Sequence, residues 1–167
     1  MPENCTRQAA WTEQELRDWC LLLEMRRDWL RVRGIRYLFV VPPDKHTVYP
    51  ERLPAWMRIS DKPTKIQQLV RHLETHSNVP ILDLSQALFD AKKIRVAYLK
   101  TDTHWNLFGA FMGCRALTEA LARQMSGLEP LPMDAYDWKP APKPPGDLVK
   151  LMGATGAYIE TESVAAV

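Results

Sequence analysis

The feature that most limits the possible folds is a short apolar run, Ile35-Arg-Tyr-Leu-Phe-Val-Val41, which ends at Pro42-Pro43. Its β-branched and aromatic residues alternate little with polar ones, which is typical of a strand buried on both faces. Proline cannot donate to a strand ladder, so we expect the strand to end there. A strand of this kind needs helices over its sheet, and the sequence therefore favours a mixed α/β fold.

Helical patterns flank this strand. Thr12-Glu-Gln-Glu15 predicts a capping box, and Gly34 supplies the stop of the helix behind it. Further along the chain we expect a helix from Pro63 to about His76, a strand at 79–84, a brief helix capped by Ser85, and a helix from about Asn106 to Gln124.

This order of elements predicts a three-layer α/β/α sandwich with a mainly parallel sheet. In such sheets the loops at the carboxyl ends of the strands carry the functional site. Segments 43–51 and 100–106 are expected at that edge.

The composition changes after residue 128. Prolines crowd the stretch that follows and predict a semi-stiff connector; they are Pro130, Pro132, Pro140, Pro142, Pro144 and Pro145. Residues 146–153 could form two helical turns, and no core pattern follows them. We therefore expect 1–128 to form the N-terminal part of an α/β domain, and 129–167 to be a Pro-rich connector and short C-terminal segment of the same domain.

Charge and hydropathy exclude several classes of protein. The net charge is +2, which gives no reason to expect a nucleic-acid partner. No stretch approaches the ~20 apolar residues of a membrane span, and the polar segment 1–14 is no signal peptide. Cys5, Cys20 and Cys114 have no metal-binding spacing, and the latter two are expected in the core.

The segment Thr101-Asp-Thr-His-Trp-Asn106 carries the strongest chemical pattern. An aspartate that holds one ring nitrogen of a histidine makes the other nitrogen a general base, so Asp102 and His104 are the candidate catalytic residues. We expect Trp105 to screen the imidazole from water and Asn106 to add a second polar group, and both are candidate substrate-binding residues. The structural alternative is that Asp102 caps the helix starting near Asn106.

Neither a metal nor a cofactor is expected. A zinc site needs three or four ligands, and no other histidine has supportive spacing. Lys45 and Tyr49, in the loop before Glu51, are candidates to line the same cleft and hold a carboxylate or a sugar hydroxyl. The alternative, which we favour, is a proline-rich turn with a structural or mixed role and solvated charges. No serine shows the glycine-flanked sharp turn that exposes a nucleophile.

Several blocks together resemble a known family. They are Pro43-Asp-Lys-His-Thr-Val-Tyr-Pro-Glu51, Leu82-Asp-Leu84, Thr101-Asp-Thr-His-Trp-Asn106 and Gly146-Asp-Leu148. They resemble the SGNH-hydrolase-like domain of bacterial alginate O-acetyltransferases. The resemblance implies a flavodoxin-like fold, a periplasmic location, and acetyl transfer to an anionic exopolysaccharide through a Ser-His-Asp triad. It also implies a membrane protein as acetyl-donor partner, with Asp102 orienting His104, the base.

Two departures from the family pattern shape the functional expectation. The family's nucleophile lies in a later Gly-Asp-Ser block, and this sequence contains none. The N-terminal export signal of the family is also missing. We therefore expect a truncated product with an incomplete sheet, which supplies the Asp-His pair but not the serine and is inactive alone. The alternatives are an SGNH-type acetyl-ester hydrolase and a non-catalytic carbohydrate-binding or scaffold fragment.

Overall fold

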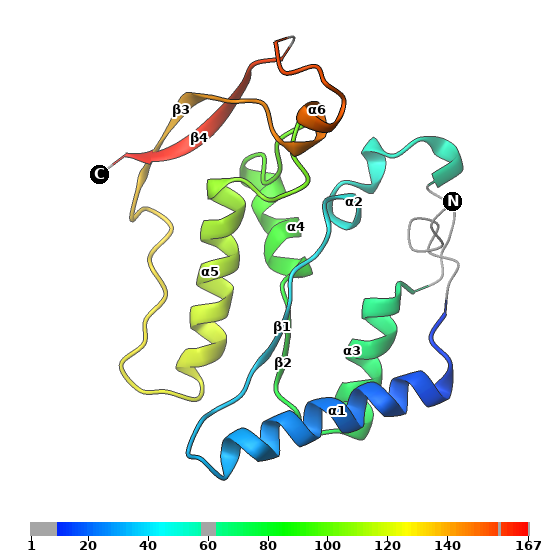
Figure 1. Ribbon diagram of the computed structural model, residues 1–167. Helices are drawn as coiled ribbons and strands as arrows, with labels where there is room; N and C mark the ends of the chain where they lie inside the picture. Colours follow the sequence, from blue (N-terminus) through cyan, green and yellow to red (C-terminus); the bar gives the residue numbers. More distant parts are fainter. Residues whose placement is uncertain (1–9, 58–62, 157, 167) are drawn as a thin grey trace. The chain divides into compact units, whose positions relative to one another are not determined.

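The computed structural model describes residues 10–57, 63–156 and 158–166 (Figure 1). They form two compact units that alternate along the chain. The first unit takes its described residues from 1–41 and 50–83, and the second from 42–49 and 84–167. The domain boundary expected after residue 128 stays a prediction, and Cys5 lies outside the described residues.

The first unit contains two helices that pack together, α1 (Glu13–Arg31) and α3 (Lys65–His76) (Figure 1). The capping box predicted for α1 is confirmed, because Thr12 Oγ1 accepts from the Glu15 amide and Glu15 accepts from the Thr12 amide. The start predicted for α3 is wrong by two residues, because the helix begins at Lys65 and not at Pro63. Thr64, rather than Pro63, leads into that helix and forms a second capping box with Gln67.

The core of this unit joins both helices to a small sheet. Cys20 and Leu23 of α1 and Leu69 and Leu73 of α3 are buried together with Val79. Strand β1 (Phe39–Val41) pairs in parallel with β2 (Ile81–Asp83), which confirms the predicted parallel pairing. The 3₁₀ turns η2 (Pro50–Arg52) and η3 (Ala55–Met57) lie between β1 and α3 in the sequence.

Both strands are shorter than predicted, and β1 is less buried. Ile35, expected inside the first strand, is 51% exposed and precedes β1 by several residues. Among the described residues β1 pairs with β2 alone, so its other edge has no ladder to extend it.

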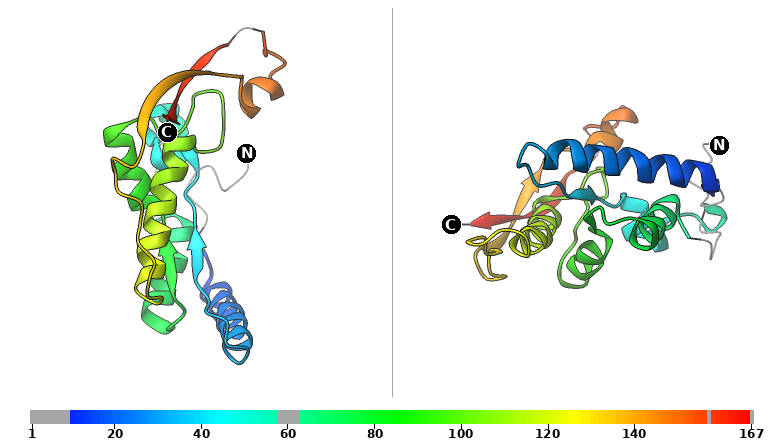
Figure 2. Two further views of the ribbon diagram at one scale, coloured as in Figure 1. Left: turned by 90° about the vertical axis from the view of Figure 1, so that its left-hand side faces the viewer. Right: turned by 90° about the horizontal axis from the view of Figure 1, so that it is seen from below.

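The second unit contains the helices α2 (Lys45–Val48), α4 (Ser85–Ile94), α5 (Leu107–Ala122) and α6 (Asp147–Leu151). Helices α4 and α5 lie side by side (Figure 2). The expectation of a plain loop after Pro43 is wrong, because α2 forms there. Ser85 is the first residue of α4 and not its cap, the capping position being Leu84.

A two-stranded antiparallel ribbon replaces the predicted connector. Strands β3 (Asp137–Lys143) and β4 (Glu160–Ala166) pair along their full length. Pro140 and Pro142 are compatible with this pairing because they are two residues apart, so both ring nitrogens point to one edge, the edge away from β4. The ribbon packs on α5 through Trp138, whose ring centroid lies 5.1 Å from that of Phe108.

The mixed α/β fold class is thus confirmed. The core position of Cys20 is confirmed as well, whereas that of Cys114 is wrong, because Cys114 is on the exposed face of α5. No helix in the described part of the chain is both long enough and apolar enough to cross a membrane.

Candidate functional site

The candidate site is the loop 98–105, which leads into α5. Tyr98 and Trp105 form an isolated antiparallel bridge that closes the loop. The Asn106 amide strengthens this closure by donating to the Ala97 carbonyl at 2.8 Å. No regular strand leads into this loop, because among the described residues 95–98 only Tyr98 makes a bridge.

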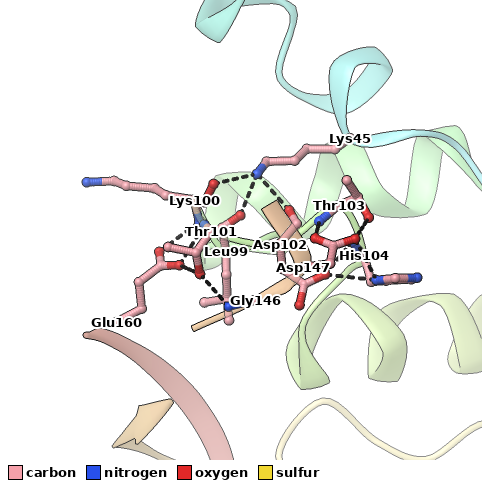
Figure 3. Close-up of polar contacts among 10 residues, drawn as sticks. All are labelled: Lys45, Leu99, Lys100, Thr101, Asp102, Thr103, His104, Gly146, Asp147 and Glu160. Carbon is pink, nitrogen blue, oxygen red and sulfur yellow. Dashed lines mark hydrogen bonds and ion pairs between the residues drawn. The ribbon is translucent and has the colours of Figure 1, made fainter. Parts of the chain in front are cut away.

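The loop brings Asp102 and His104 together as the sequence predicts (Figure 3). Asp102 Oδ1 lies 2.8 Å from His104 Nδ1 and also accepts from the His104 amide at 2.9 Å. An ionised carboxylate only accepts hydrogen bonds, so this contact assigns the ring proton to Nδ1 and leaves Nε2 as the basic nitrogen.

The surroundings of the imidazole differ from the expectation. The His104 side chain is 77% exposed, so the predicted screening by Trp105 is wrong. Trp105 instead packs on α5, where Gly113 leaves room for its ring: a Cβ at Gly113 would lie 3.1 Å from Trp105 Cζ3. Gly109 similarly lets the Ala97 carbonyl approach the helix.

Asn106, rather than Asp102, caps α5. Its Oδ1 accepts from the Gly109 amide at 2.9 Å, and its Nδ2 donates to the Val96 carbonyl at 2.7 Å. Asn106 is buried, and both ends of its amide are engaged by the main chain. The structural alternative for Asp102 as the helix cap is therefore wrong.

A second carboxylate, Asp147, stands beside the pair (Figure 3). It accepts from the Thr103 amide at 2.7 Å and from the Thr103 hydroxyl, and its Oδ2 lies 3.7 Å from His104 Nδ1. The hydrogen bond from the Thr103 hydroxyl, together with those from the Thr103 and Leu148 amides, holds the pKa of Asp147 below its ordinary value, although burial acts in the opposite direction.

Asp102, His104 and Asp147 offer ligand atoms within 4.8 Å of one another, which is a spacing that a divalent cation could bridge. The hydrogen bonds to Thr103 and between Asp102 and His104 already engage these groups. We assign no metal to them.

Lys45, predicted to contact substrate, points to the main chain of the loop. Its Nζ donates to the carbonyl oxygens of Leu99 at 2.6 Å, Lys100 at 3.0 Å and Asp102 at 2.8 Å. These contacts engage all of the N–H bonds of an ammonium group. Burial lowers the pKa of Lys45, and the carboxylates of Glu160, Asp102 and Asp147 oppose that effect.

Tyr49, the other predicted substrate contact, also supports the main chain. Its hydroxyl accepts from the Ala97 amide at 3.0 Å, and its ring meets that of Tyr98 edge to face. The structure therefore places Lys45, Tyr49, Trp105 and Asn106 around the loop that carries Asp102 and His104. Their substrate contacts stay predictions.

Sequence reasoning missed two glutamates of β4. Glu160 accepts from the amides of Lys100 and Thr101, both at 2.7 Å, and from the Thr101 hydroxyl. Glu162 is 3% exposed, pairs with Lys143 at 2.8 Å, and accepts from the Leu107 amide at the start of α5. Their spacing of two residues on one strand face was the only available signal.

Comparison with known proteins agrees with the resemblance in the motifs. Residues 3–165 match the family of SGNH hydrolase-like domains of the acetyltransferase AlgX. The Pseudomonas putida protein named "Probable alginate O-acetylase AlgJ" is 32% identical over 116 residues, which are 69% of this chain and 30% of that protein.

Solved structures show the same likeness. The O-acetyltransferase domain of P. putida AlgJ is 26% identical with a TM-score of 0.60, and the match covers 91% of this chain and 58% of that one. Bacillus cereus PatB1 shares the fold, at 19% identity and a TM-score of 0.60, over 95% of this chain and 50% of that one. The chain thus spans about a third to three fifths of these relatives, and it belongs to the AlgX family of SGNH hydrolase-like acetyltransferase domains.

Proposed function

We propose that this sequence carries the acid–base half of a polysaccharide O-acetyltransferase, with His104 as general base and Asp102 as its orienting acid. The observation that supports the proposal most directly is the 2.8 Å contact between Asp102 Oδ1 and His104 Nδ1 on an exposed imidazole. Membership of an acetyltransferase family supports the same reaction class.

The proposed chemistry has two balanced steps. A serine hydroxyl attacks the acetyl carbonyl of the donor while His104 Nε2 takes the hydroxyl proton, and the imidazolium then protonates the leaving group. A sugar hydroxyl next attacks the acetyl-serine, giving its proton to Nε2, which returns a proton to the serine oxygen. Asp102 steadies the imidazolium in both steps.

The serine in this proposal lies outside the sequence, since no Gly-Asp-Ser occurs among the 167 residues. The polysaccharide acceptor, the membrane-bound acetyl donor and the periplasmic location enter the proposal through the resemblance to alginate O-acetyltransferases. A similar protein of Pseudomonas putida is named a probable alginate O-acetylase. An anionic polysaccharide is therefore the first acceptor to test.

The test uses a longer family member in which the Thr-Asp-Thr-His-Trp-Asn block is followed by a Gly-Asp-Ser block. Replacing the histidine that corresponds to His104 by Ala should lower acetyl transfer to alginate oligosaccharides by about a thousandfold or more. The present chain, assayed alone, should transfer no more acetyl than its own His104→Ala variant. Unchanged turnover in the longer variant contradicts the proposal.

Two alternatives have specific support. The 77% exposure of His104 leaves it open to water, which favours comparison with an acetyl-ester hydrolase. Assays with and without sugar acceptor separate the two, because a hydrolase releases acetate at the same rate in both. The lack of Gly-Asp-Ser favours a carbohydrate-binding or scaffold fragment. Binding of an anionic oligosaccharide in calorimetry, without turnover in the longer protein, supports that alternative.

A further inference from the structure

We propose that Lys45 and Glu160 are positioning residues, which grip the main chain of the loop 98–105 from two sides and so hold Asp102 and His104 in their mutual geometry. The inference deepens the proposed function and rests on it for the meaning of the Asp-His pair. The test does not depend on the proposed function, because it measures the geometry of the Asp-His pair itself.

The first side of the grip is the ammonium of Lys45. One nitrogen collects the carbonyl oxygens of Leu99, Lys100 and Asp102 (Figure 3). A charged donor forms stronger hydrogen bonds than a neutral one. Because one of these carbonyls belongs to Asp102 itself, the position of Lys45 fixes the backbone from which that carboxylate extends.

The second side is the carboxylate of Glu160. Its oxygens accept from the Lys100 and Thr101 amides, both at 2.7 Å, and from the Thr101 hydroxyl. Lys100 therefore has its carbonyl on Lys45 and its amide on Glu160. Burial opposes ionisation of Glu160, but the hydrogen bonds from Thr101 and Lys100 and the charge of Lys45 outweigh it and lower the pKa of Glu160.

A loop with little regular pairing needs such partners. Apart from the bridge between Tyr98 and Trp105, the segment between these residues has no strand or helix ladder. Its polar main-chain groups would otherwise turn to water, and the loop would sample many conformations. Lys45 and Glu160 come from α2 and β4, which are far apart in the sequence, so the grip forms only in the folded unit.

The test uses ¹⁵N-labelled histidine and follows the ring nitrogens of His104 by NMR. The unaltered chain should show His104 held as the Nδ1–H tautomer. Lys45→Met and Glu160→Gln remove the charge with little change of side-chain size, and each should give His104 the averaged ring signals of an unrestrained imidazole. Lys93→Met and Glu129→Gln are matched controls at exposed positions of the same unit and should leave the signals unchanged.

Amide hydrogen exchange in the unaltered chain gives a second measurement that needs no variant. The amides of Lys100 and Thr101 should exchange about tenfold or more slowly than the amide of exposed Gly156, after correction for local sequence. Exchange of these amides as fast as at Gly156 overturns the proposal. If both variants fail to fold, this measurement alone tests the proposal.

Folded Lys45→Met and Glu160→Gln variants that keep the wild-type His104 signals also overturn the proposal. A different result would reject the proposed function but not the positioning role of Lys45 and Glu160. In that case His104 shows restrained signals in this chain, while acetyl transfer in the longer protein does not depend on its histidine. The two failures are therefore distinguishable.

Discussion

Asp102 uses one oxygen for both of its contacts with His104, the amide at 2.9 Å and the ring nitrogen at 2.8 Å. The amide contact is local and fixes the turn, while the ring contact fixes the tautomer. We expect these contacts to orient the imidazole ring more than they stabilise the fold, because the His104 side chain is 77% exposed and water screens the pair.

Replacing Asp102 by Asn should therefore change the tautomer and spare the fold. The amide of the new side chain removes the negative charge that holds the Nδ1 proton, so we expect His104 to lose its fixed Nδ1–H form. The free energy of unfolding should change by less than about 1 kcal/mol. Ring ¹⁵N spectra and urea unfolding measure the two quantities. A preserved Nδ1–H tautomer would show that Asp102 does not orient the ring.

Gly146 also affects the position of Asp102, because it packs directly against that residue. A Cβ there would stand 2.5 Å from the Thr101 carbonyl oxygen, 2.6 Å from Asp102 Cβ and 2.7 Å from Asp102 Oδ2. Its φ of −74° suits any residue, so the constraint is close packing and not backbone conformation.

Gly146→Ala should consequently push Asp102 out of place. We expect a loss of about 1–3 kcal/mol in the free energy of unfolding and a changed His104 ring spectrum. Gly156→Ala is the matched control, since nothing lies within 4 Å of a Cβ at that position. Equal unfolding midpoints for the two alanine variants would contradict the packing described for Gly146.

Strand β4 is the element that most extends the site beyond what the sequence revealed. Glu160 accepts a hydrogen bond from the loop before His104, and Glu162 accepts one from the first amide of α5, after His104. One face of the strand therefore contacts the chain on both sides of His104 in the sequence. Lys143 of β3 completes the arrangement by neutralising Glu162, which is 3% exposed.

Removing the positive charge of Lys143 should destabilise this element. Lys143→Met leaves the buried Glu162 carboxylate without its cation, and because the lysine itself is partly exposed we expect a loss of about 1–3 kcal/mol. Lys139→Met, on the same strand, breaks an exposed pair with Asp137 and should change stability by less than about 1 kcal/mol. Urea unfolding compares the two variants, and an equal effect would show that the burial of Glu162 is unimportant.

The sequence predicts some elements better than others, depending on whether neighbouring or distant residues determine them. The box at Thr12 and the helix through Cys20 depend on neighbouring residues, so they could be read directly. Strands β3 and β4 could not, because prolines argue against a strand unless the pairing edge is known. The Asp102–His104 contact is local and was predicted, whereas the partners of Lys45 are more than fifty residues away.

At the scale of the whole molecule, several carboxylates have lowered pKa values: Glu15, Asp28, Asp90, Asp147 and Glu160. A carboxyl group with a lower pKa in the folded state binds fewer protons there than in the unfolded state. Its stabilising effect is complete above the unfolded pKa and disappears as the pH falls through the folded pKa.

The chain should therefore lose stability in acid, beginning near the ordinary pKa values of 4.5 for glutamate and 3.8 for aspartate and continuing below them. Urea unfolding between about pH 6 and about pH 3 measures this loss. Glu160→Gln cannot gain that proton, so its stability should fall less steeply with acid than that of the Glu129→Gln control. Parallel curves for the two variants would mean that Glu160 is not held ionised by Thr101, Lys100 and Lys45, and the stability of the loop would then have to come from its neutral contacts.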